Sequence, residues 1–269
     1  MRRVILNLLR CPRCRRGALL PETDTAELVF GPLRCPECQA SFPVAEGVAD
    51  LVMDRSPASM GPMQRGLEQP LVARSYERYV RPAMQYAVAR RRYDRESELL
   101  LYRSLLGQPD GPVLDVACGT GLFARRLARD PTVPPVVGMD VSKPMIEEGV
   151  AQAREAGVMV DFLRAEAPEL PFQDQSFGAV LQTGALHLIA DASRLFLEVG
   201  RVLRPGGQYV ASTYTPPGAL LTALHRRAGL HPRTEDELRS AIAAAGLVAF
   251  ERMLLPPFIV VKGEKPSRK

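Results

Sequence analysis

No stretch of this 269-residue sequence approaches the roughly 18 consecutive apolar residues of a membrane-spanning helix. The N-terminus carries two arginines before an apolar run, but that run is too short for a secretory signal and no small-residue cleavage site follows. Leu9 and Arg10 also differ from the small residues expected before a lipoprotein cysteine. The net charge of +5 is too small for a dedicated nucleic-acid-binding arm. These absences predict a soluble, cytoplasmic protein without a membrane span.

Four of the five cysteines form two Cys-x-x-Cys pairs, Cys11 with Cys14 and Cys35 with Cys38. Their separation is typical of a four-thiolate zinc site, and a reducing compartment disfavours disulfides. Redox dithiols are the alternative. Four protein ligands close a zinc site, so the predicted metal is structural and supplies folding free energy that so short a segment lacks. We therefore expect a zinc ribbon over residues 1–53.

The remaining chain divides into three predicted parts. Residues 54–70 contain several prolines and glycines without periodicity, which is typical of a linker. Residues 71–107 have a helical pattern, broken near Pro82, with many arginines and several tyrosines. This helical connector is either a solvated basic face or a lid over a ligand cleft. Residues 108–269 form the main predicted domain.

Strands and helices alternate through residues 108–269, which predicts a Rossmann-like, doubly wound, mostly parallel α/β sheet. Ser142 is expected to cap one helix, and the Thr234 to Glu237 spacing predicts a capping box on the last. Residues 204–207 are expected to form a turn. After the first strand at residue 113, further strands are expected at 136–140, 158–163, 178–183, 208–213, 247–252 and 258–262.

Residues 113–121 read Val-Leu-Asp-Val-Ala-Cys-Gly-Thr-Gly and precede a helical pattern, which indicates a strand, a tight turn and a helix. The spacing from Gly119 through Gly121 to Ala124 also fits a dinucleotide-binding turn. Asp115 separates these readings, because an acid beside the helix start would repel pyrophosphate and attract a cation. A cationic nucleoside without phosphate describes S-adenosylmethionine (SAM). The turn therefore predicts SAM as the cofactor.

Two further acids are expected at the same sheet edge. Asp140 ends the second strand about twenty residues beyond the glycine turn, where an acid accepts hydrogen bonds from both ribose hydroxyls. Glu166 follows the third strand, where it can meet the adenine amino group. Each acid could instead cap a helix, but three caps at these spacings are an improbable coincidence.

Four motifs occur in order: residues 114–121, 137–142, 165–172 with Ser176 and Phe177, and 201–207. In this order they resemble the class I SAM-dependent methyltransferases of type 11, the group that includes the ubiquinone and menaquinone methyltransferases. The resemblance implies SAM over the first, second and fourth strands and a sheet that ends in an antiparallel hairpin. Glu166 stands where these enzymes more usually have aspartate. The predicted cofactor-binding residues are Asp115, Ala117, Gly119, Gly121, Asp140, Val141, Glu166, Ala167 and Thr183.

A zinc ribbon ahead of such a domain resembles two subgroups. One comprises the ribosomal RNA guanine-N1 methyltransferases, in which a segment similar to residues 42–47 follows the ribbon. The other comprises uncharacterised plastid and bacterial methyltransferases with an Ala-Leu-His segment after the fourth strand. Residues 185–187 and the tyrosine-bearing residues 76–86 match the second subgroup better.

The predicted function is methyl transfer to the oxygen or carbon of a small, hydrophobic or aromatic acceptor. Positioning supplies most of the acceleration of such a displacement, and His187 is the candidate general base. Arg226, Arg227 and Arg233 either line an acceptor site for anions or phenolates or are solvated.

RNA base methylation and a non-catalytic SAM-binding adaptor are the alternatives. No Asn-Pro-Pro-Tyr motif of base amino-group methylation follows Thr183. Acids offset the arginines of the ribbon, so RNA binding is expected to be weak.

Overall fold

The computed structural model describes residues 1–53, 62–89, 94–215, 218–227 and 229–267. The N-terminal region contains a short helix and an antiparallel set of four short strands. Gly31 and Pro32 open a strand in which residues 31–34 pair with residues 41–44. The elements are α1 (Arg3–Leu6), β1 (Leu20–Pro21), β2 (Gly31–Arg34), β3 (Ser41–Ala45) and β4 (Val48–Asp50).

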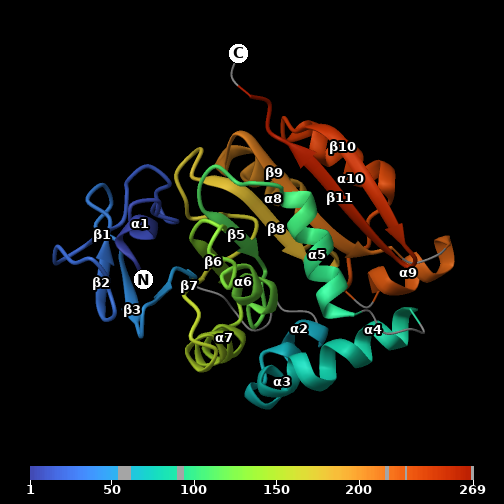
Figure 1. Ribbon diagram of the computed structural model, residues 1–269, viewed down its shortest axis with the longest axis horizontal. Helices are drawn as coiled ribbons and strands as arrows, with labels where there is room; N and C mark the ends of the chain where they lie inside the picture. Colours follow the sequence, from blue (N-terminus) through green and yellow to red (C-terminus); the bar gives the residue numbers. More distant parts are fainter. Residues whose placement is uncertain (54–61, 90–93, 216–217, 228, 268–269) are drawn as a thin grey trace.

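The central sheet contains seven further strands, in the order β7-β6-β5-β8-β9-β11-β10 (Figure 1). The pairs from β7 to β9 are parallel, whereas β11 runs antiparallel to β9 and β10 antiparallel to β11. This confirms the mostly parallel sheet and the antiparallel hairpin at its end. The strands are β5 (Val113–Val116), β6 (Val136–Asp140), β7 (Val160–Arg164), β8 (Phe177–Thr183), β9 (Leu203–Tyr214), β10 (Val248–Leu255) and β11 (Phe258–Glu264).

Residues 204–207 were expected to form a turn but belong to β9, which starts at Leu203. The pairing of β8 with β9 shifts between Phe177 and Ala179, so an irregular stretch takes up the extra residues without leaving the strand. The Gly-Gly pair in this stretch lets the backbone pass close to Gly178, where a Cβ on Gly207 would lie 3.0 Å from the Gly178 carbonyl oxygen.

The N-terminal region is continuous with the central sheet. Strand β4 pairs in parallel with β7, aligning Ala49 with Leu163 and Asp50 with Arg164, so one eleven-stranded sheet runs through the molecule. Leu9, Cys11 and Phe172 belong to a single buried apolar cluster that also includes the core of the sheet. Figure 1 shows this region as the left-hand third of the molecule, joined to the sheet at β7. The sequence did not predict this junction.

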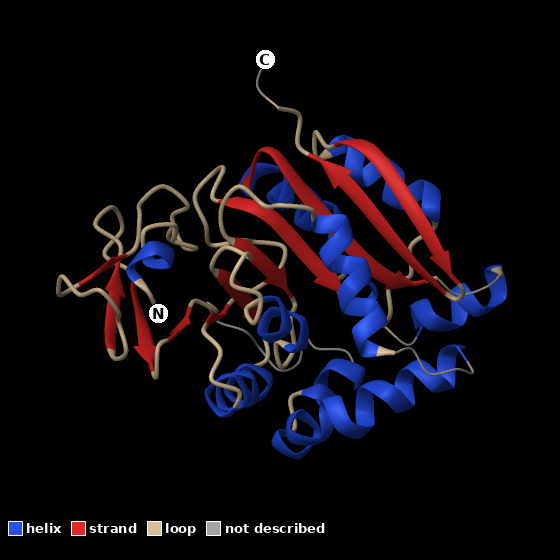
Figure 2. Ribbon diagram, viewed as in Figure 1, coloured by secondary structure: helices blue, strands red, loops and turns tan. Residues whose placement is uncertain are grey.

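Helices cover both faces of the sheet (Figure 2). Residues of α5 and α6 form one apolar cluster with Val113 and Ala179, while α8 and α10 pack in the other cluster with Leu114 and Val180. Adjacent residues of one strand therefore point to opposite layers, as expected for a sheet buried on both faces. The helices are α5 (Arg95–Leu106), α6 (Leu122–Leu127), α7 (Lys143–Glu155), α8 (Ala192–Val202), α9 (Ala219–Arg227) and α10 (Glu235–Ala244).

The two capping predictions had different outcomes. The capping box of α10 is confirmed, since the Glu237 amide donates to Thr234 and the Glu237 carboxylate accepts from the Thr234 amide. Ser142 occupies the N-cap position of α7, but its side chain does not cap the helix. Its hydroxyl donates instead to Glu68 at 3.2 Å, so a residue of a distant turn redirects it.

Residues 62–67, assigned to the linker from sequence, form helix α2 (Pro62–Leu67), while residues 54–61 of that linker lie outside the described ranges. The predicted break near Pro82 is a π-helical turn (Tyr76–Val80) that joins α3 (Pro70–Ser75) to α4 (Arg81–Ala89). Pro82 has no amide hydrogen for the carbonyl of Arg78, which favours a wider turn at this point. Arg90, Arg91 and Arg92 lie outside the described residues. Within the described ranges, no helix is both long and apolar enough to cross a membrane.

Candidate functional site

The glycine turn lies between β5 and α6 and requires unusual backbone angles. Ala117, Gly119 and Gly121 all have positive φ, at 54°, 58° and 73°. A Cβ on Gly121 would also lie 2.6 Å from a ring carbon of Phe162, so a larger residue would have to displace that ring. The sequence reading of a strand, a tight turn and a helix is therefore confirmed, with glycine needed at Gly121 for both space and conformation.

Asp140 binds the glycine turn at the end of β6. Its Oδ2 accepts the Gly119 amide at 2.7 Å, and its Oδ1 accepts the Ser142 amide at 2.8 Å. One carboxylate thus connects the turn to the start of α7. An ionised carboxylate has about four acceptor positions, so these two amides leave capacity for hydroxyl donors from a ligand.

Asp115 lies beneath the turn and is 1% exposed. Loss of hydration raises the pKa of its carboxyl to about 8; the Ala124 amide lowers it and the nearby Asp140 charge raises it further. Its Oδ1 has no hydrogen-bond partner among the described residues. Asp115 is therefore largely protonated at neutral pH, which weakens the attraction for a cation on which the sequence argument relied.

The protonated Asp115 makes folding stability depend on pH. Its folded-state pKa lies above the unfolded value, so the native state holds a proton that the unfolded state releases, and stability falls as pH rises from about 4 towards about 8. We expect Asp115→Asn, which cannot ionise, to flatten this fall and to raise the denaturation midpoint at pH 8 relative to the parent. Urea denaturation at pH 5 and pH 8 measures it. Equal pH dependence in the two proteins would contradict the assignment.

A cavity of about 400 Å³ opens at this sheet edge. Neither Asp115 nor Gly121 is among the described residues that line it. Acidic side chains of Glu68 and Asp191 add to those expected from the sequence. Of the predicted cofactor residues, the cavity brings together Ala117, Gly119, Asp140, Val141, Glu166, Ala167 and Thr183.

The helical segment 70–89 contacts the glycine turn. Glu77, in the π turn, accepts a hydrogen bond of 2.5 Å from the Thr120 hydroxyl and pairs with the buried Arg125 guanidinium. Tyr76, the preceding residue, lies 3.9 Å from the Cβ position of Gly119, and burial raises the pKa of its phenol. Tyr76 and its neighbours therefore form one wall of the cavity. The tyrosines at helical spacing, Tyr76 among them, were the sequence signal for this contact.

A second cavity, of about 570 Å³, adjoins the first. Tyr76, Arg81, Thr183 and His187 are among the residues that line both, so these side chains mark the boundary between the two spaces. The second cavity extends away from the glycine turn, between α5, α9 and the β10–β11 hairpin. Its lining is mainly apolar and includes Leu101, Tyr102, Leu230, Met253, Leu255, Phe258 and Val260.

His187, the candidate base, lies on a single 3-10 turn (Leu186–Leu188) at the boundary. Burial lowers its pKa to about 4, and the neighbouring His225 contributes further. The imidazole is neutral at physiological pH and can accept a hydrogen bond, but it is a weak proton acceptor. His225 enters the second cavity from α9, and its Nδ1 lies 2.6 Å from the Leu221 carbonyl oxygen.

The three arginines that were expected either to line an acceptor site or to be solvated lie outside the two cavities. Arg226 and Arg227 are exposed and line neither cavity, and Arg226 is 3.8 Å from Glu237. Arg233 donates to the Ala190 carbonyl at 3.0 Å and lines neither of the two cavities. The alternative of a solvated surface therefore fits Arg226 and Arg227, whereas Arg233 is half-buried.

The four predicted metal ligands come together in the N-terminal region. All four sulfur atoms lie within 4.8 Å of one another, with 3.7 Å between Cys11 and Cys38 and 3.6 Å between Cys14 and Cys35. A tetrahedral Zn–S₄ site with bonds of about 2.3 Å requires S···S distances of about 3.8 Å. The cluster therefore fits a zinc ion. A Cβ on Gly17 would lie 2.7 Å from the Cys35 sulfur, a requirement for glycine that the sequence analysis did not detect.

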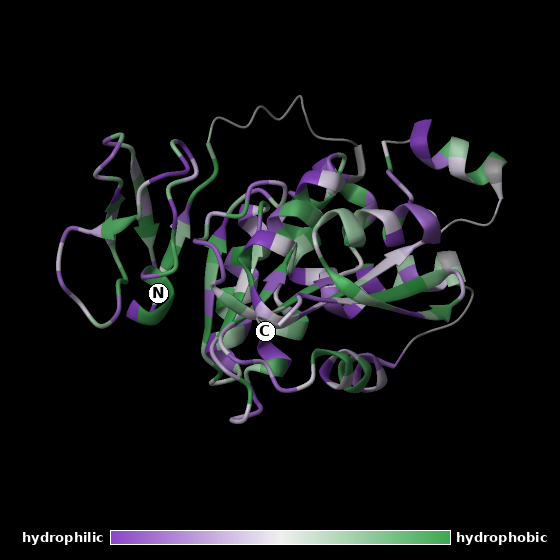
Figure 3. Cartoon of the chain, turned by 90° about the horizontal axis from the view of Figure 1, so that it is seen from above, coloured by the Kyte–Doolittle hydropathy of each residue, from purple (hydrophilic) through white to green (hydrophobic). Residues whose placement is uncertain are grey.

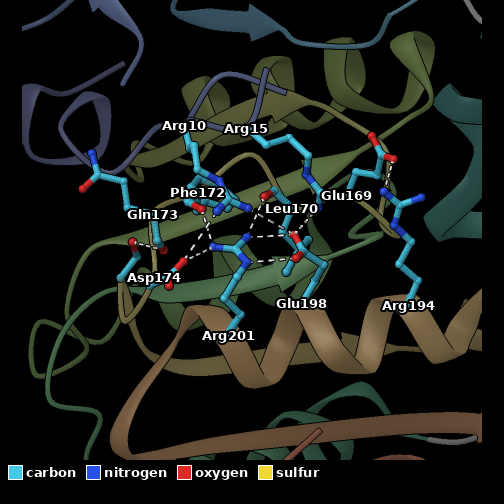
Figure 4. Close-up of polar contacts among 11 residues, drawn as sticks. Arg10, Arg15, Glu169, Leu170, Phe172, Gln173, Asp174, Arg194, Glu198 and Arg201 are labelled. Carbon is cyan, nitrogen blue, oxygen red and sulfur yellow. Dashed lines mark hydrogen bonds and ion pairs between the residues drawn. The ribbon is translucent and has the colours of Figure 1, made fainter. Parts of the chain in front are cut away.

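A network of charged side chains links this region to α8 (Figure 4). Arg201 donates to both Glu198 and Asp174 and to the carbonyl oxygens of residues 170 and 172. Arg10 and Arg15, which flank the first cysteine pair, contribute ion pairs with Glu198 at 3.8 and 3.3 Å. Helix α8 and the N-terminal region therefore both bind the segment that follows Glu166.

Known proteins resemble this chain in both sequence and fold. Residues 113–207 match a methyltransferase domain family. The chain is 34% identical over 175 residues to an uncharacterised chloroplastic methyltransferase of Arabidopsis thaliana, covering 58% of this chain and 48% of that protein. It is 43% identical over 107 residues to the ubiquinone/menaquinone biosynthesis C-methyltransferase UbiE of Desulfotalea psychrophila, covering 40% of this chain and 43% of that protein. The chain spans about half the length of the curated relatives it matches.

Among solved structures, the YcgJ protein of Bacillus subtilis has the same fold, with a TM-score of 0.57 at 20% identity. This likeness covers 64% of the present chain and 100% of that chain. The matched residues contain the glycine turn and the strand-end acid Asp140. The sheet order, the site and the relatives agree: residues 113–207 form a methyltransferase domain, and the chain is similar over this part to SAM-dependent methyltransferases.

Proposed function

We propose that this protein transfers a methyl group from SAM to an oxygen or carbon of a small, hydrophobic or aromatic acceptor. The observation that carries the proposal is the pair of adjoining cavities, one with four acidic side chains at the glycine turn and one with a more apolar lining. A polar nucleoside and an apolar acceptor would meet at their common boundary. That arrangement suits a displacement in which donor and acceptor have to be held in line.

Residues of the first cavity fit the cofactor. Asp140 retains acceptor capacity for the ribose hydroxyls, and Glu166 lines the cavity beyond it for the adenine amino group. Ala117 and Gly119 leave little side chain between the backbone and the ligand. SAM supplies, when bound, a methyl group on a cationic sulfur.

The second cavity sets the acceptor class. Its aromatic side chains pack together, since the centre of the Tyr214 ring lies 6.2 Å from that of the Phe258 ring and 5.3 Å from that of the His225 ring. Such surroundings favour a flat apolar molecule over a charged one. His187 is neutral at the boundary and accepts a hydrogen bond from a hydroxyl of the acceptor, which orients that hydroxyl. Because the pKa of His187 is low, positioning is its main contribution.

For the N-terminal region we propose a structural zinc bound by Cys11, Cys14, Cys35 and Cys38. The sulfur separations fit a tetrahedral ion. All four ligand positions come from the protein, so this metal takes no part in the reaction.

Incubation with methyl-labelled SAM and separate RNA, protein and lipid-soluble extracts tests the acceptor class. We expect label in the lipid-soluble extract, and we expect Phe258→Ala to reduce it about tenfold or more, because Phe258 lines the apolar cavity and covering an aromatic side chain with an apolar partner contributes about 1.5–3 kcal/mol. Phe30→Ala, at a phenylalanine that is 67% exposed on the N-terminal region, is the matched control and should leave labelling unchanged. Label confined to RNA or protein would contradict the proposal.

RNA methylation is the second candidate, and the charge arrangement disfavours it. Arg2 forms an ion pair with Asp161 at 2.6 Å, and Arg10 and Arg15 pair with Glu198. These arginines bind the protein's own acids and are less available for phosphates. A SAM-binding adaptor remains the third candidate, and it predicts SAM binding without labelling of any extract.

A further inference from the structure

Acidic side chains outnumber basic ones among the described residues that line the two cavities. Asp140, Glu166, Glu68 and Asp191 line the first cavity, and Asp94 and Glu98 line the second. Among the described lining residues, Arg81 is the single arginine or lysine, and it lines both cavities. SAM carries two cations and one carboxylate. The acids suit the cations, and Arg81 is the one permanent cation at hand for the carboxylate.

Arg81 is held in a defined position. It is the first residue of α4, and the π turn before it is attached to the glycine turn through Glu77. Its guanidinium lies 5.3 Å from the centre of the Phe123 ring, and its Nη2 donates to Glu98 at 2.6 Å. Its Nη1 is buried without a hydrogen-bond partner among the described residues. A buried charged donor without a partner is unfavourable, which indicates that a partner is missing.

The strand order gives the direction of the ligand. Glu166 follows β7 and Asp140 ends β6, so the adenosine part lies towards the β7 side of the glycine turn. The other end of the molecule then lies towards β8, whose last residue, Thr183, lines the cavity together with Arg81. The methionyl carboxylate is the charged group at that end.

We infer that Arg81 binds the methionyl carboxylate of SAM, an inference that rests on the proposed function. A guanidinium pairs with a carboxylate in a bidentate geometry, which fixes orientation as well as distance. Arg81 thereby holds the sulfur at the boundary of the two cavities with the methyl group facing the acceptor. Glu98 keeps the guanidinium in place from the α5 side.

Calorimetry with two ligands tests this assignment. S-adenosylhomocysteine contains the carboxylate, whereas 5′-methylthioadenosine lacks the whole amino-acid portion. We expect Arg81→Ala to weaken S-adenosylhomocysteine binding about ten- to a hundredfold, the range for a hydrogen-bonded charged pair, and to leave methylthioadenosine binding unchanged. Arg81→Gln keeps a donor for Glu98 and the bulk over Phe123, and it should give the same pattern if the alanine variant unfolds.

Arg126→Ala is the matched control. Arg126 pairs with Glu96 on the same helix that supplies Glu98, but it lines neither cavity. It should bind both ligands as the parent does. Equal losses for the two ligands in the Arg81 variants, no loss for either, or the same loss in Arg126→Ala would overturn the inference. Failure of the parent to bind S-adenosylhomocysteine or SAM at all would instead reject the proposed function.

Discussion

Replacing Cys35 with serine is expected to abolish zinc binding and to unfold residues 1–53. Structural zinc contributes roughly 10–16 kcal/mol of apparent binding free energy in small zinc domains. The strands of this region are two to five residues long. They bury too little surface to remain folded alone. Metal analysis of chelator-free protein should give one zinc for the parent and none for Cys35→Ser, with hydrogen exchange reporting the loss of the short strands.

The effect is expected to extend to the cofactor cavity. Strand β4 pairs with β7, the Arg10 amide donates to the Pro171 carbonyl, and the Gln173 amide donates to the Leu8 carbonyl. These bonds hold the segment that begins with Glu166. We therefore expect Cys35→Ser to weaken SAM binding as well, although no cysteine of the cluster lines the cavity among the described residues.

Cys118→Ser serves as the control for metal content, because Cys118 lies in the glycine turn and outside the cluster. It should retain one zinc and normal exchange over residues 1–53. A parent protein with almost no metal and a folded N-terminal region would reject the zinc proposal. Metal loss without any change in SAM affinity would reject the coupling between the two sites.

The features that the sequence predicted correctly depend on local patterns. The capping box of α10 needs two residues three positions apart, and the glycine turn needs an apolar strand followed by two glycines. The cysteine pairs are local patterns too, because each Cys-x-x-Cys pair spans only four residues. Alternation of strands and helices then restricts the topology, since parallel connections are short and right-handed.

The features that were missed depend on contacts between distant residues. Neither strand segment alone indicates that Ala49 pairs with Leu163. The ion pair between Arg2 and Asp161 could not be predicted either, because nothing in the sequence around Asp161 distinguishes it from other acidic residues in strands. Ser142 stands where a helix cap is expected, but its hydroxyl donates to Glu68, a contact that the sequence does not indicate. Arg81 was one arginine among many in a helical segment, and only the π turn and the two cavities distinguish it.

Replacing Asp140 with alanine is expected to reduce SAM affinity at least tenfold. A hydrogen bond to a charged group contributes about 1.5–3 kcal/mol, and the carboxylate is proposed to accept two ribose hydroxyls. The structure adds a second cost. Asp140 also accepts the amides of Gly119 and Ser142, so its removal leaves both without this acceptor and loosens the glycine turn. Calorimetric titration with SAM measures the sum of these losses.

Asp140→Asn separates charge from shape. The asparagine side chain keeps one oxygen, but its amide group would face an N–H of the turn at the other position, donor against donor. We therefore expect the asparagine variant to bind SAM nearly as weakly as the alanine variant. Asp130→Ala is the control, because Asp130 also accepts a backbone amide, that of Thr132 at 2.9 Å, in a surface turn that lines neither cavity. Unchanged SAM affinity in Asp140→Ala, or tight binding of NAD by the parent, would reject Asp140 as the ribose-binding residue. A loss in Asp140→Ala that Asp130→Ala does not share would tie SAM binding to the carboxylate that holds Gly119, and so to the turn itself.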